Sequence, residues 1–209
     1  MRNRLLLTVA VLAMATGCTT TSEGTPLPGP STEVAASSTK PPASGEGLPS
    51  DGAPKVENPL DVSHFEQHPC DTLTAEDART LNIPATGEQT GDAIGETCFW
   101  RNSETRGSLA VSFFSGDGGG LSSLYREAKG VGWPYFKRIA DIGNHPAVAY
   151  NINEKKPQIT CTIAVGLSDR LAFTTRVALS DANIDNKKDP CEVAARVAGM
   201  LMSTMLEAA

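Results

Sequence analysis

Four cysteines, at positions 70, 98, 161 and 191, limit the folds open to this chain more than any other sequence feature. Two cysteines joined by a disulfide must have their Cα atoms within about 7 Å of each other. The fifth cysteine, Cys18, belongs to the N-terminal segment described below, which indicates export; the remaining even number of cysteines then indicates disulfides. Two bonds would therefore hold two pairs of distant segments together. Four cysteines allow three connectivities, and spacing alone leaves all of them open.

The pairing that we favour joins Cys70 to Cys98 and Cys161 to Cys191. Cys70 precedes one expected helix and Cys191 opens another, so each bond would attach the start of a helix to a strand. Each bond would close a loop of about 30 residues, which corresponds to about 3–4 kcal/mol in the chain-entropy account. A four-cysteine zinc site is the alternative, and the sequence has no Cys-x-x-Cys pair to support it.

The first 17 residues have the features of a secretion signal. Residues 2–4 carry two arginines, and residues 5–15 form an apolar run interrupted by a single threonine. This run is shorter than the ~20 residues that span a bilayer, but it fits the apolar region of a signal peptide. The segment ends in Ala-Thr-Gly-Cys at positions 15–18, which resembles a bacterial lipobox.

In a lipobox, small residues precede a cysteine that is acylated and becomes the first residue of the mature protein. We therefore expect Cys18 to carry a palmitate-type lipid anchor and to hold the protein on the extracytoplasmic face of the cell membrane. Ala15 departs from the leucine that is usual three residues before the cysteine. An ordinary secretory signal with an unrelated cysteine is the alternative.

Residues 19–57 predict a flexible linker that follows the lipidated cysteine. They contain no aromatic residue, and 24 of the 39 are Gly, Pro, Ser or Thr. Such a segment cannot bury enough apolar surface to offset its ordering entropy. As a coil it would span about 35 Å and hold the next domain away from the membrane. Whether its Ser and Thr residues are glycosylated stays open. Residues 58–209 remain for one globular domain.

The charge of the expected domain argues against one class of partner. Residues 58–209 hold 14 Lys and Arg against 19 Asp and Glu, so the domain is acidic. No basic surplus is available to neutralise phosphates, and we expect no nucleic-acid partner. The same deficit gives no reason to expect attraction to anionic lipid head groups.

Alternation of apolar and polar residues predicts about five strands. Residues 108–114 alternate as a half-buried strand does. Residues 159–165 and 171–177 also alternate, and the short turn between them predicts an antiparallel hairpin. Two more strands are expected around residues 98–100 and 147–151.

Capping residues and apolar spacing predict the helices. Thr74 can begin a helix that ends near Leu81, before an Ile-Pro pair. A second helix is expected over residues 121–129. Asp189 and Pro190 begin the last helix. We expect its apolar stripe to pack on the core, and the stripe consists of Val193, Val197, Met200, Leu201, Thr204 and Met205. The simplest architecture is α+β, with helices packed on a mainly antiparallel sheet of about five strands.

A series of short motifs runs through residues 58–209. In order they are Asn58-Pro59, Pro69-Cys70-Asp71, Leu73-Thr74, Cys98-Phe99-Trp100, Gly143, Pro146-Ala147, Cys161 and Cys191-Glu192. In these motifs and their spacing the sequence resembles the actinobacterial lipoproteins grouped as domain of unknown function 3558. The resemblance implies an envelope lipoprotein with a disulfide-bonded α+β domain, and it implies no reaction. A looser similarity to the fold of PsbP-like and Mog1-like proteins concerns topology alone.

The three histidines do not form a recognisable metal motif. His64 and His68 would lie on one face of a helix, with Glu66 between them. The zinc-protease motif needs the glutamate directly after the first histidine, and Pro69 disfavours helical geometry at His68. A solvated lead-in to the domain is the simpler interpretation. His145 lies in an expected turn before a strand. We expect no metal and no cofactor.

Patterns typical of reactive sites are also absent from the sequence. There is no Gly-x-Ser-x-Gly motif, and no cysteine is spare for a nucleophile if both disulfides form. The glycine-rich loop at residues 116–120 lacks the endings and spacings of phosphate-binding loops, so we interpret it as a flexible connection. Carboxylates occur singly, without a paired acid and base. The sequence therefore predicts a protein that is not an enzyme.

Trp133, Tyr135 and Phe136 are the candidate contacts for a ligand or a partner protein. They lie between an expected helix and an expected strand, where loops often carry binding residues. Exposed aromatic side chains there would line a ligand groove or anchor a partner. The alternative is that they close one end of the core.

The first functional hypothesis is a non-catalytic envelope lipoprotein whose domain binds an extracytoplasmic ligand or partner protein. Its support is the lipobox, the linker and the cysteines. One alternative is an envelope enzyme whose acid/base site is assembled only in the fold. The other is a passive structural surface lipoprotein, which would have neither a pocket nor an exposed aromatic patch.

Overall fold

The computed structural model describes residues 47–91, 95–115 and 119–209 of the chain. The expected signal, the expected lipidation site Cys18 and the expected linker up to residue 46 lie outside these residues. The elements below therefore belong to the expected globular domain and to the segment directly before it.

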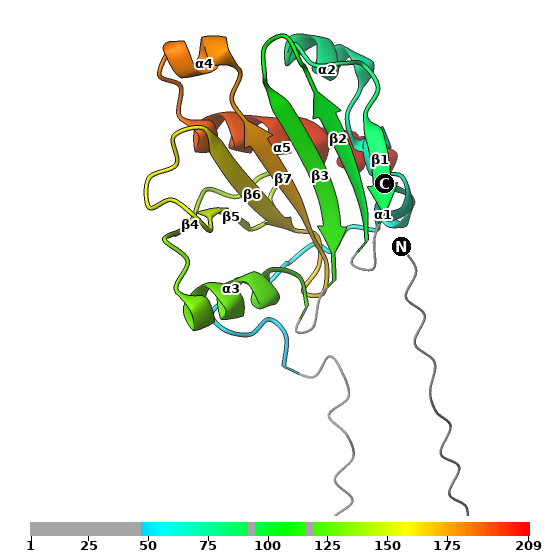
Figure 1. The fold of residues 1–209 in the computed structure, drawn as a ribbon. Coiled ribbons are helices and arrows are strands. Elements are labelled where there is room, and N and C mark those ends of the chain that lie inside the picture. Colours follow the sequence, from blue (N-terminus) through cyan, green and yellow to red (C-terminus); the bar gives the residue numbers. More distant parts are fainter. Residues whose placement is uncertain (1–46, 92–94, 116–118) are drawn as a thin grey trace, which may run out of the picture. The chain divides into compact units, whose positions relative to one another are not determined.

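Within the described residues, seven strands form one sheet in the order β1-β2-β3-β7-β6-β5-β4 (Figure 1). Every neighbouring pair is antiparallel. The central pairing of β3 with β7 joins an N-terminal three-stranded half to a C-terminal four-stranded half. The strands are β1 (Glu88–Gly91), β2 (Glu96–Arg101), β3 (Ser108–Phe114), β4 (Tyr135–Arg138), β5 (Ala147–Asn151), β6 (Thr160–Gly166) and β7 (Ala172–Ala178).

The prediction of about five strands is corrected by two additional strands at the edges of the sheet. β1 and β4 contain four residues each, and each pairs with one neighbour. All four residues of β1 are exposed, so it has no apolar alternation to reveal it. Backbone hydrogen bonds to the next strand hold such an edge strand, and these leave no pattern in the side chains. The five predicted strands are present at the expected positions.

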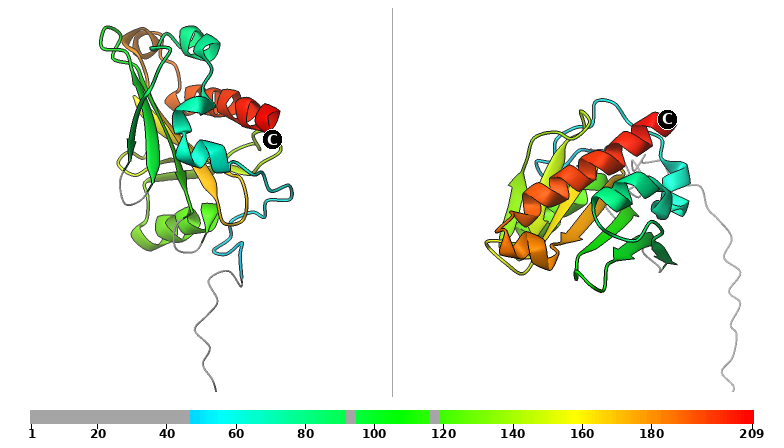
Figure 2. Two further views of the ribbon diagram at one scale, coloured as in Figure 1. Left: turned by 90° about the vertical axis from the view of Figure 1, so that its right-hand side faces the viewer. Right: turned by 90° about the horizontal axis from the view of Figure 1, so that it is seen from above.

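Most helices cover one face of the sheet (Figure 2). That face carries α1 (Ser63–Gln67), the 3₁₀ helix η1 (Pro69–Thr72), α2 (Ala75–Thr80) and the long α5 (Pro190–Ala208). α3 (Gly120–Val131) packs on the opposite face, and α4 (Asp181–Asp185) follows β7. Across residues 47–91, 95–115 and 119–209, no helix is long and apolar enough to cross a membrane.

The predicted helix starts are confirmed by their caps. The Thr74 hydroxyl accepts a hydrogen bond from the backbone N–H of Asp77 at 3.1 Å. The Asp189 carboxylate accepts bonds from the N–H groups of Cys191 at 2.7 Å and Glu192 at 3.3 Å. These side chains satisfy backbone donors that a helix leaves unpaired at its first turn.

The main core lies between the sheet and α5. Trp100, Ile163 and Phe173 of the sheet are fully buried there, together with residues of α5. The predicted stripe is confirmed at three positions and shifted at others, because the half-buried Met200 and Thr204 lie beside the contact face. The residues of α5 that are buried against the sheet are Ala194, Val197, Ala198, Leu201, Met202 and Met205.

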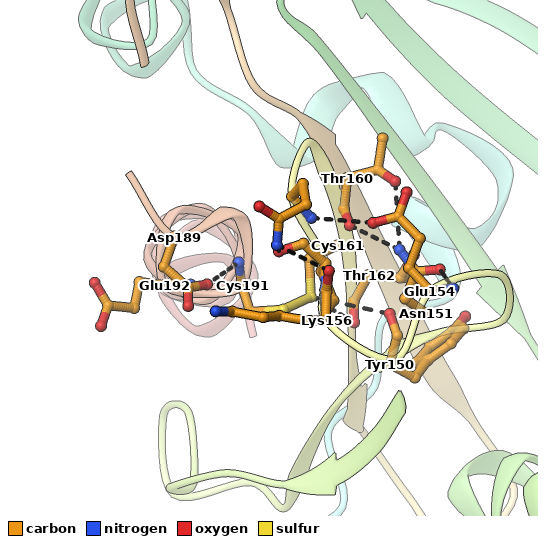
Figure 3. The surroundings of a disulfide bond; sticks show 12 residues. Tyr150, Asn151, Glu154, Lys156, Thr160, Cys161, Thr162, Asp189, Cys191 and Glu192 are labelled. Atoms are coloured by element: carbon orange, nitrogen blue, oxygen red, sulfur yellow. Dashed lines mark hydrogen bonds between the residues drawn. A yellow bond between two sulfur atoms is a disulfide. The ribbon is translucent and has the colours of Figure 1, made fainter. Parts of the chain in front are cut away.

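Two disulfides join helix starts to strands, as the favoured pairing predicted. Cys70 in η1 is bonded to Cys98 in β2, with Cα atoms 5.1 Å apart. Cys161 in β6 is bonded to Cys191 in the first turn of α5, with Cα atoms 5.0 Å apart (Figure 3). Each bond therefore fixes the helical layer to the sheet at a different place.

The segment before Asn58 contacts the domain. Val56 is 4 % exposed, and its N–H donates to the Asp169 carboxylate at 2.9 Å. Nearer the N-terminus, the Ser50 N–H donates to the Ser122 hydroxyl in α3, also at 2.9 Å. The described fold thus includes residues that composition alone assigns to the linker. Hydrogen bonds to α3 and to the β6–β7 turn hold this segment, and composition does not reveal them.

Candidate ligand-binding groove

The face of the sheet opposite α5 is only partly covered. α3 covers one end of that face with a small second core, which includes Leu121, Leu124 and Val148. Beyond α3 the sheet is open (Figure 2, left view) and holds a cavity of about 320 Å³, which we call the groove. The groove is lined by Thr97, Phe99, Ala110, Ser112, Tyr150, Asn151, Ile152, Asn153, Thr160, Thr162, Thr174 and Arg176.

Strand register places five of these residues in one row across the groove. Phe99 of β2 lies opposite Ala110 of β3, which lies opposite Arg176 of β7. Arg176 lies opposite Thr162 of β6, which in turn lies opposite Tyr150 of β5. Neighbouring strands are about 4.8 Å apart, so the row is about 19 Å long, with Arg176 in its middle.

The groove is hollow because most of the side chains around Arg176 on this face are small. Along each strand, large apolar residues point toward α5, and residues on the alternate positions point into the groove. Next to the row of Arg176, register brings Thr97, Ser112 and Thr174 together, and the first two share a hydrogen bond of 2.8 Å between their hydroxyls. Larger apolar side chains stand at the margins, where Phe99 is 41 % exposed and Ile152 is 55 % exposed.

Arg176 is the one charged side chain among the residues that line the groove. It is exposed, although it lies on a central strand of the sheet. Across the part of the chain that the structure describes, its guanidinium makes no hydrogen bond and no ion pair. The five N–H donors of this group are therefore free to bind a ligand.

Tyr150 contributes a protonated phenol to one end of the row. Its ring is half-buried and stacked on Trp133, with ring centroids 4.9 Å apart. Burial raises the pKa of Tyr150 to about 12; the Glu127 carboxylate also raises this pKa, and Arg176 lowers it. The phenol consequently keeps its proton at any physiological pH and can donate a hydrogen bond.

Asn151 shapes the edge of the groove from a buried position. Its side-chain N–H₂ donates to the Thr160 carbonyl at 2.9 Å (Figure 3). Its side-chain oxygen accepts bonds from the N–H groups of Asn153 at 2.9 Å and Glu154 at 3.0 Å. These bonds fix the start of the β5–β6 loop, which places Ile152 at the margin of the groove.

The predicted aromatic residues do not line the groove. The sequence placed them in a loop, but Tyr135 and Phe136 belong to the edge strand β4. Trp133 and Phe136 pack on the α3 side of the sheet, where Phe136 also contacts Tyr125 edge-on at 4.9 Å. Tyr135 packs against the main core on the other face. This packing is the arrangement expected if they close one end of the core, and Trp133 reaches the groove only through Tyr150.

The histidines occupy separate places. His64 in α1 and His68 just after it are exposed, with ring centroids 5.0 Å apart, and His64 Nε2 lies 2.8 Å from an Asp71 carboxylate oxygen. His145 is 3 % exposed, and its Nδ1 lies 2.9 Å from the Gly143 carbonyl. Among the described side chains, no group of three or more His, Cys, Asp or Glu is placed to hold a metal ion.

The described part of the glycine-rich loop fits closely against the β6–β7 turn. Gly119 and Gly120 have positive φ angles of 74° and 41°. A Cβ on Gly119 would lie 2.8 Å from the Asp169 carbonyl, so a larger residue would collide with the turn. These two glycines therefore serve close packing, and residues 116–118 lie outside the described residues.

The groove can therefore bind polar and anionic groups through a free cation and several hydroxyls. None of its lining residues is a carboxylate, a histidine or a cysteine. Sequence reasoning missed Arg176, Thr162 and Thr174, because a polar residue at alternate positions of a strand looks the same whether it faces bulk solvent or a hollow. The one available signal was a charged residue inside a predicted strand whose other residues are uncharged.

Comparison with known protein families gives a match for this chain. The chain matches the family described as "Protein of unknown function (DUF3558)" over residues 13–204, which is most of its length. The comparisons with curated proteins and with solved structures found no match. The likeness to the PsbP-like and Mog1-like fold thus stays a prediction.

Proposed function

The chain belongs to the DUF3558 family of unknown function, and from this premise we propose that it is a lipid-anchored extracytoplasmic protein that binds a ligand in the groove. The proposal has two parts, which are the anchor at Cys18 and the non-catalytic binding domain. They rest on different features of the chain and are tested separately.

The observation that carries the binding function is the unpaired Arg176 in the middle of the groove. A guanidinium in this position has small neighbours on the same face, with Ala110 and Thr162 beside it on the adjacent strands. The cavity of about 320 Å³ is at the lower end of the range typical of small-molecule sites. A passive structural protein would have no need for a free cation above a floor of small residues.

The anchor is supported by the sequence and by the disulfides. The lipobox ending at Cys18 and the Pro/Ser/Thr/Gly-rich linker are typical of a tethered domain. Both pairs of the remaining cysteines are bonded in the structure, as in proteins that work in oxidising compartments outside the cytoplasm.

The groove favours binding over catalysis. Acid/base chemistry needs titratable groups beside the reacting atoms, and the lining residues offer a guanidinium, hydroxyls and amides. An enzymatic function would require an acid/base pair from outside the groove.

Native mass spectrometry of the chain, gently extracted from its own membranes without reduction, tests the binding function. We expect a retained extra mass that is released on unfolding. Ala110 lies between Phe99 and Arg176 in the row, so Ala110→Trp should fill the groove and abolish the retained mass. Ala140→Trp is the matched control, because Ala140 is exposed and outside the groove. A bare wild-type chain, or a mass that Ala110→Trp does not affect, would contradict the proposal.

A further inference from the structure

We infer that the ligand of the groove is a small organic acid, whose single carboxylate binds Arg176 and whose ring or alkyl chain packs on Phe99. The inference rests on the proposed function and specifies the class of ligand. It follows from three features of the groove, which are its charge, its hydrogen-bond donors and its exposed apolar margins.

Charge selects a ligand with one negative group, which binds in the middle of the groove. Arg176 supplies the single positive charge of the groove, and a guanidinium pairs with a carboxylate through two parallel hydrogen bonds. Beyond Phe99, the neighbouring hollow is lined by Glu88 and Arg101, whose charges offset each other. At the other end of the row, the negative charge of Glu127 contributes to the raised pKa of Tyr150. The groove itself therefore offers one positive charge, which matches a ligand with a single carboxylate placed at Arg176.

Hydroxyl donors surround the position that the carboxylate would take. Thr162 is the neighbour of Arg176 on β6, and Thr174 precedes it by two residues on the same face of β7. The hydroxyls of both threonines are without hydrogen-bond partners among the residues that the structure describes. The phenol of Tyr150 lies one strand beyond Thr162. A carboxylate at Arg176 thus meets groups that can donate to both of its oxygens.

An apolar part of the ligand has a place at the Phe99 end. Phe99 is two strands from Arg176, about 10 Å away along the row. Ala110 lies between them and leaves a shallow floor. The Phe99 ring is 41 % exposed, so a ring or alkyl chain that covers it would remove apolar surface from water. The volume of the groove suits a free small molecule better than a segment of a partner protein.

Binding of 4-phenylbutanoate and of its uncharged isostere, 4-phenylbutanamide, tests the inference. Both compounds are titrated into the purified chain with both disulfides formed, and amide NMR shifts locate the site. We expect the acid to bind about tenfold more tightly than the amide, as one charge-assisted pair in a partly exposed site allows. Added salt should weaken binding of the acid and leave the amide unchanged.

Three variants separate the role of Arg176 from a general loss of structure. Arg176→Gln should remove the difference between acid and amide while the affinity for the amide stays the same. Arg176→Lys should keep part of the difference, because it keeps the charge and loses the planar fork. Arg196→Gln, at an exposed position on α5, is the matched control and should behave like the wild type.

Each other outcome overturns the inference. Equal affinities for acid and amide would show that charge does not select the ligand. Tight acid binding that Arg176→Gln leaves unchanged would place the carboxylate elsewhere. Absence of binding by either compound would also contradict the inference, since the pair matches the proposed chemistry and length. The proposed function is tested independently of these results: it fails if the chain extracted from its membranes retains no extra mass from a bound ligand.

Discussion

Removal of the disulfide between Cys161 and Cys191 should lower the free energy of unfolding by several kcal/mol. The bond connects β6 to the first turn of α5 across a sequence separation of 30 residues. In the chain-entropy account, a loop of this length contributes about 3.6 kcal/mol. That amount is a large fraction of the roughly 5–15 kcal/mol by which domains are stable.

The perturbation is the double variant Cys161→Ala, Cys191→Ala. Cys161 is 1 % exposed, so loss of its sulfur adds about 1 kcal/mol for reduced packing. We therefore expect a total loss of about 4–5 kcal/mol. The double variant Cys70→Ala, Cys98→Ala is the comparison, because its bond spans 28 residues and Cys98 is also fully buried. The two losses should agree within about 1 kcal/mol.

The free energy of unfolding is measured by urea denaturation. The fluorescence of the buried Trp100 and circular dichroism report the unfolding transition. An osmolyte such as trimethylamine N-oxide keeps the less stable variants folded at zero urea. The reduced wild type separates the cross-link from the packing of the sulfur atoms. A loss below about 1 kcal/mol for Cys161→Ala, Cys191→Ala would refute the argument from loop length. So would a difference of more than about 2 kcal/mol between the two double variants.

Four further predictions concern Tyr150, Cys18, Trp133 and Asp189. The folded Tyr150 phenol keeps its proton up to a pKa of about 12, whereas in the unfolded chain it ionises near 10; stability therefore falls as the pH rises through this range. In urea unfolding, the wild type should lose about 1.3 kcal/mol more than Tyr150→Phe between pH 9 and pH 11, and equal losses would contradict burial of the phenol. Cys18→Ser should release the protein into the medium or stall its maturation, as seen by cell fractionation, and unchanged membrane association would exclude the lipid anchor. Trp133→Ala should lower the free energy of unfolding by about 2 kcal/mol, since its half-buried ring stacks on Tyr150. The retained ligand mass should persist in that variant, and its loss at unchanged stability would instead make Trp133 a binding residue. Asp189→Ala should cost about 1 kcal/mol in thermal unfolding, because two backbone N–H groups of α5 lose their acceptor, and an unchanged melting temperature would contradict this capping role.

Features encoded by near neighbours in the chain were predicted from the sequence. The alternation over residues 108–114 marks β3 at its observed bounds, since a half-buried strand must place every second side chain in the core. Thr74 and Asp189 mark helix starts, because their side chains bond to N–H groups two or three residues further on. The sequence favoured the observed cysteine pairing without excluding the other two connectivities, since the choice depends on which helix start lies beside which strand.

Edge strands and the groove depended on the tertiary structure. Strand β1 consists of three polar residues and a glycine, all exposed, and it is a strand only because β2 offers its backbone as a partner. Arg176 and Phe99 are 77 positions apart in the sequence. The pairing of β2 with β3 and of β3 with β7 places them in one row. A strand pattern specifies which residues share a face, but strand order and register decide which side chains meet on it. The sequence by itself thus determined five of the strands and the capped helix starts, because these depend on near neighbours in the chain. The edge strands, the choice among the three cysteine connectivities and the groove were decided only where the strands were assembled and α3 covered one end of their open face.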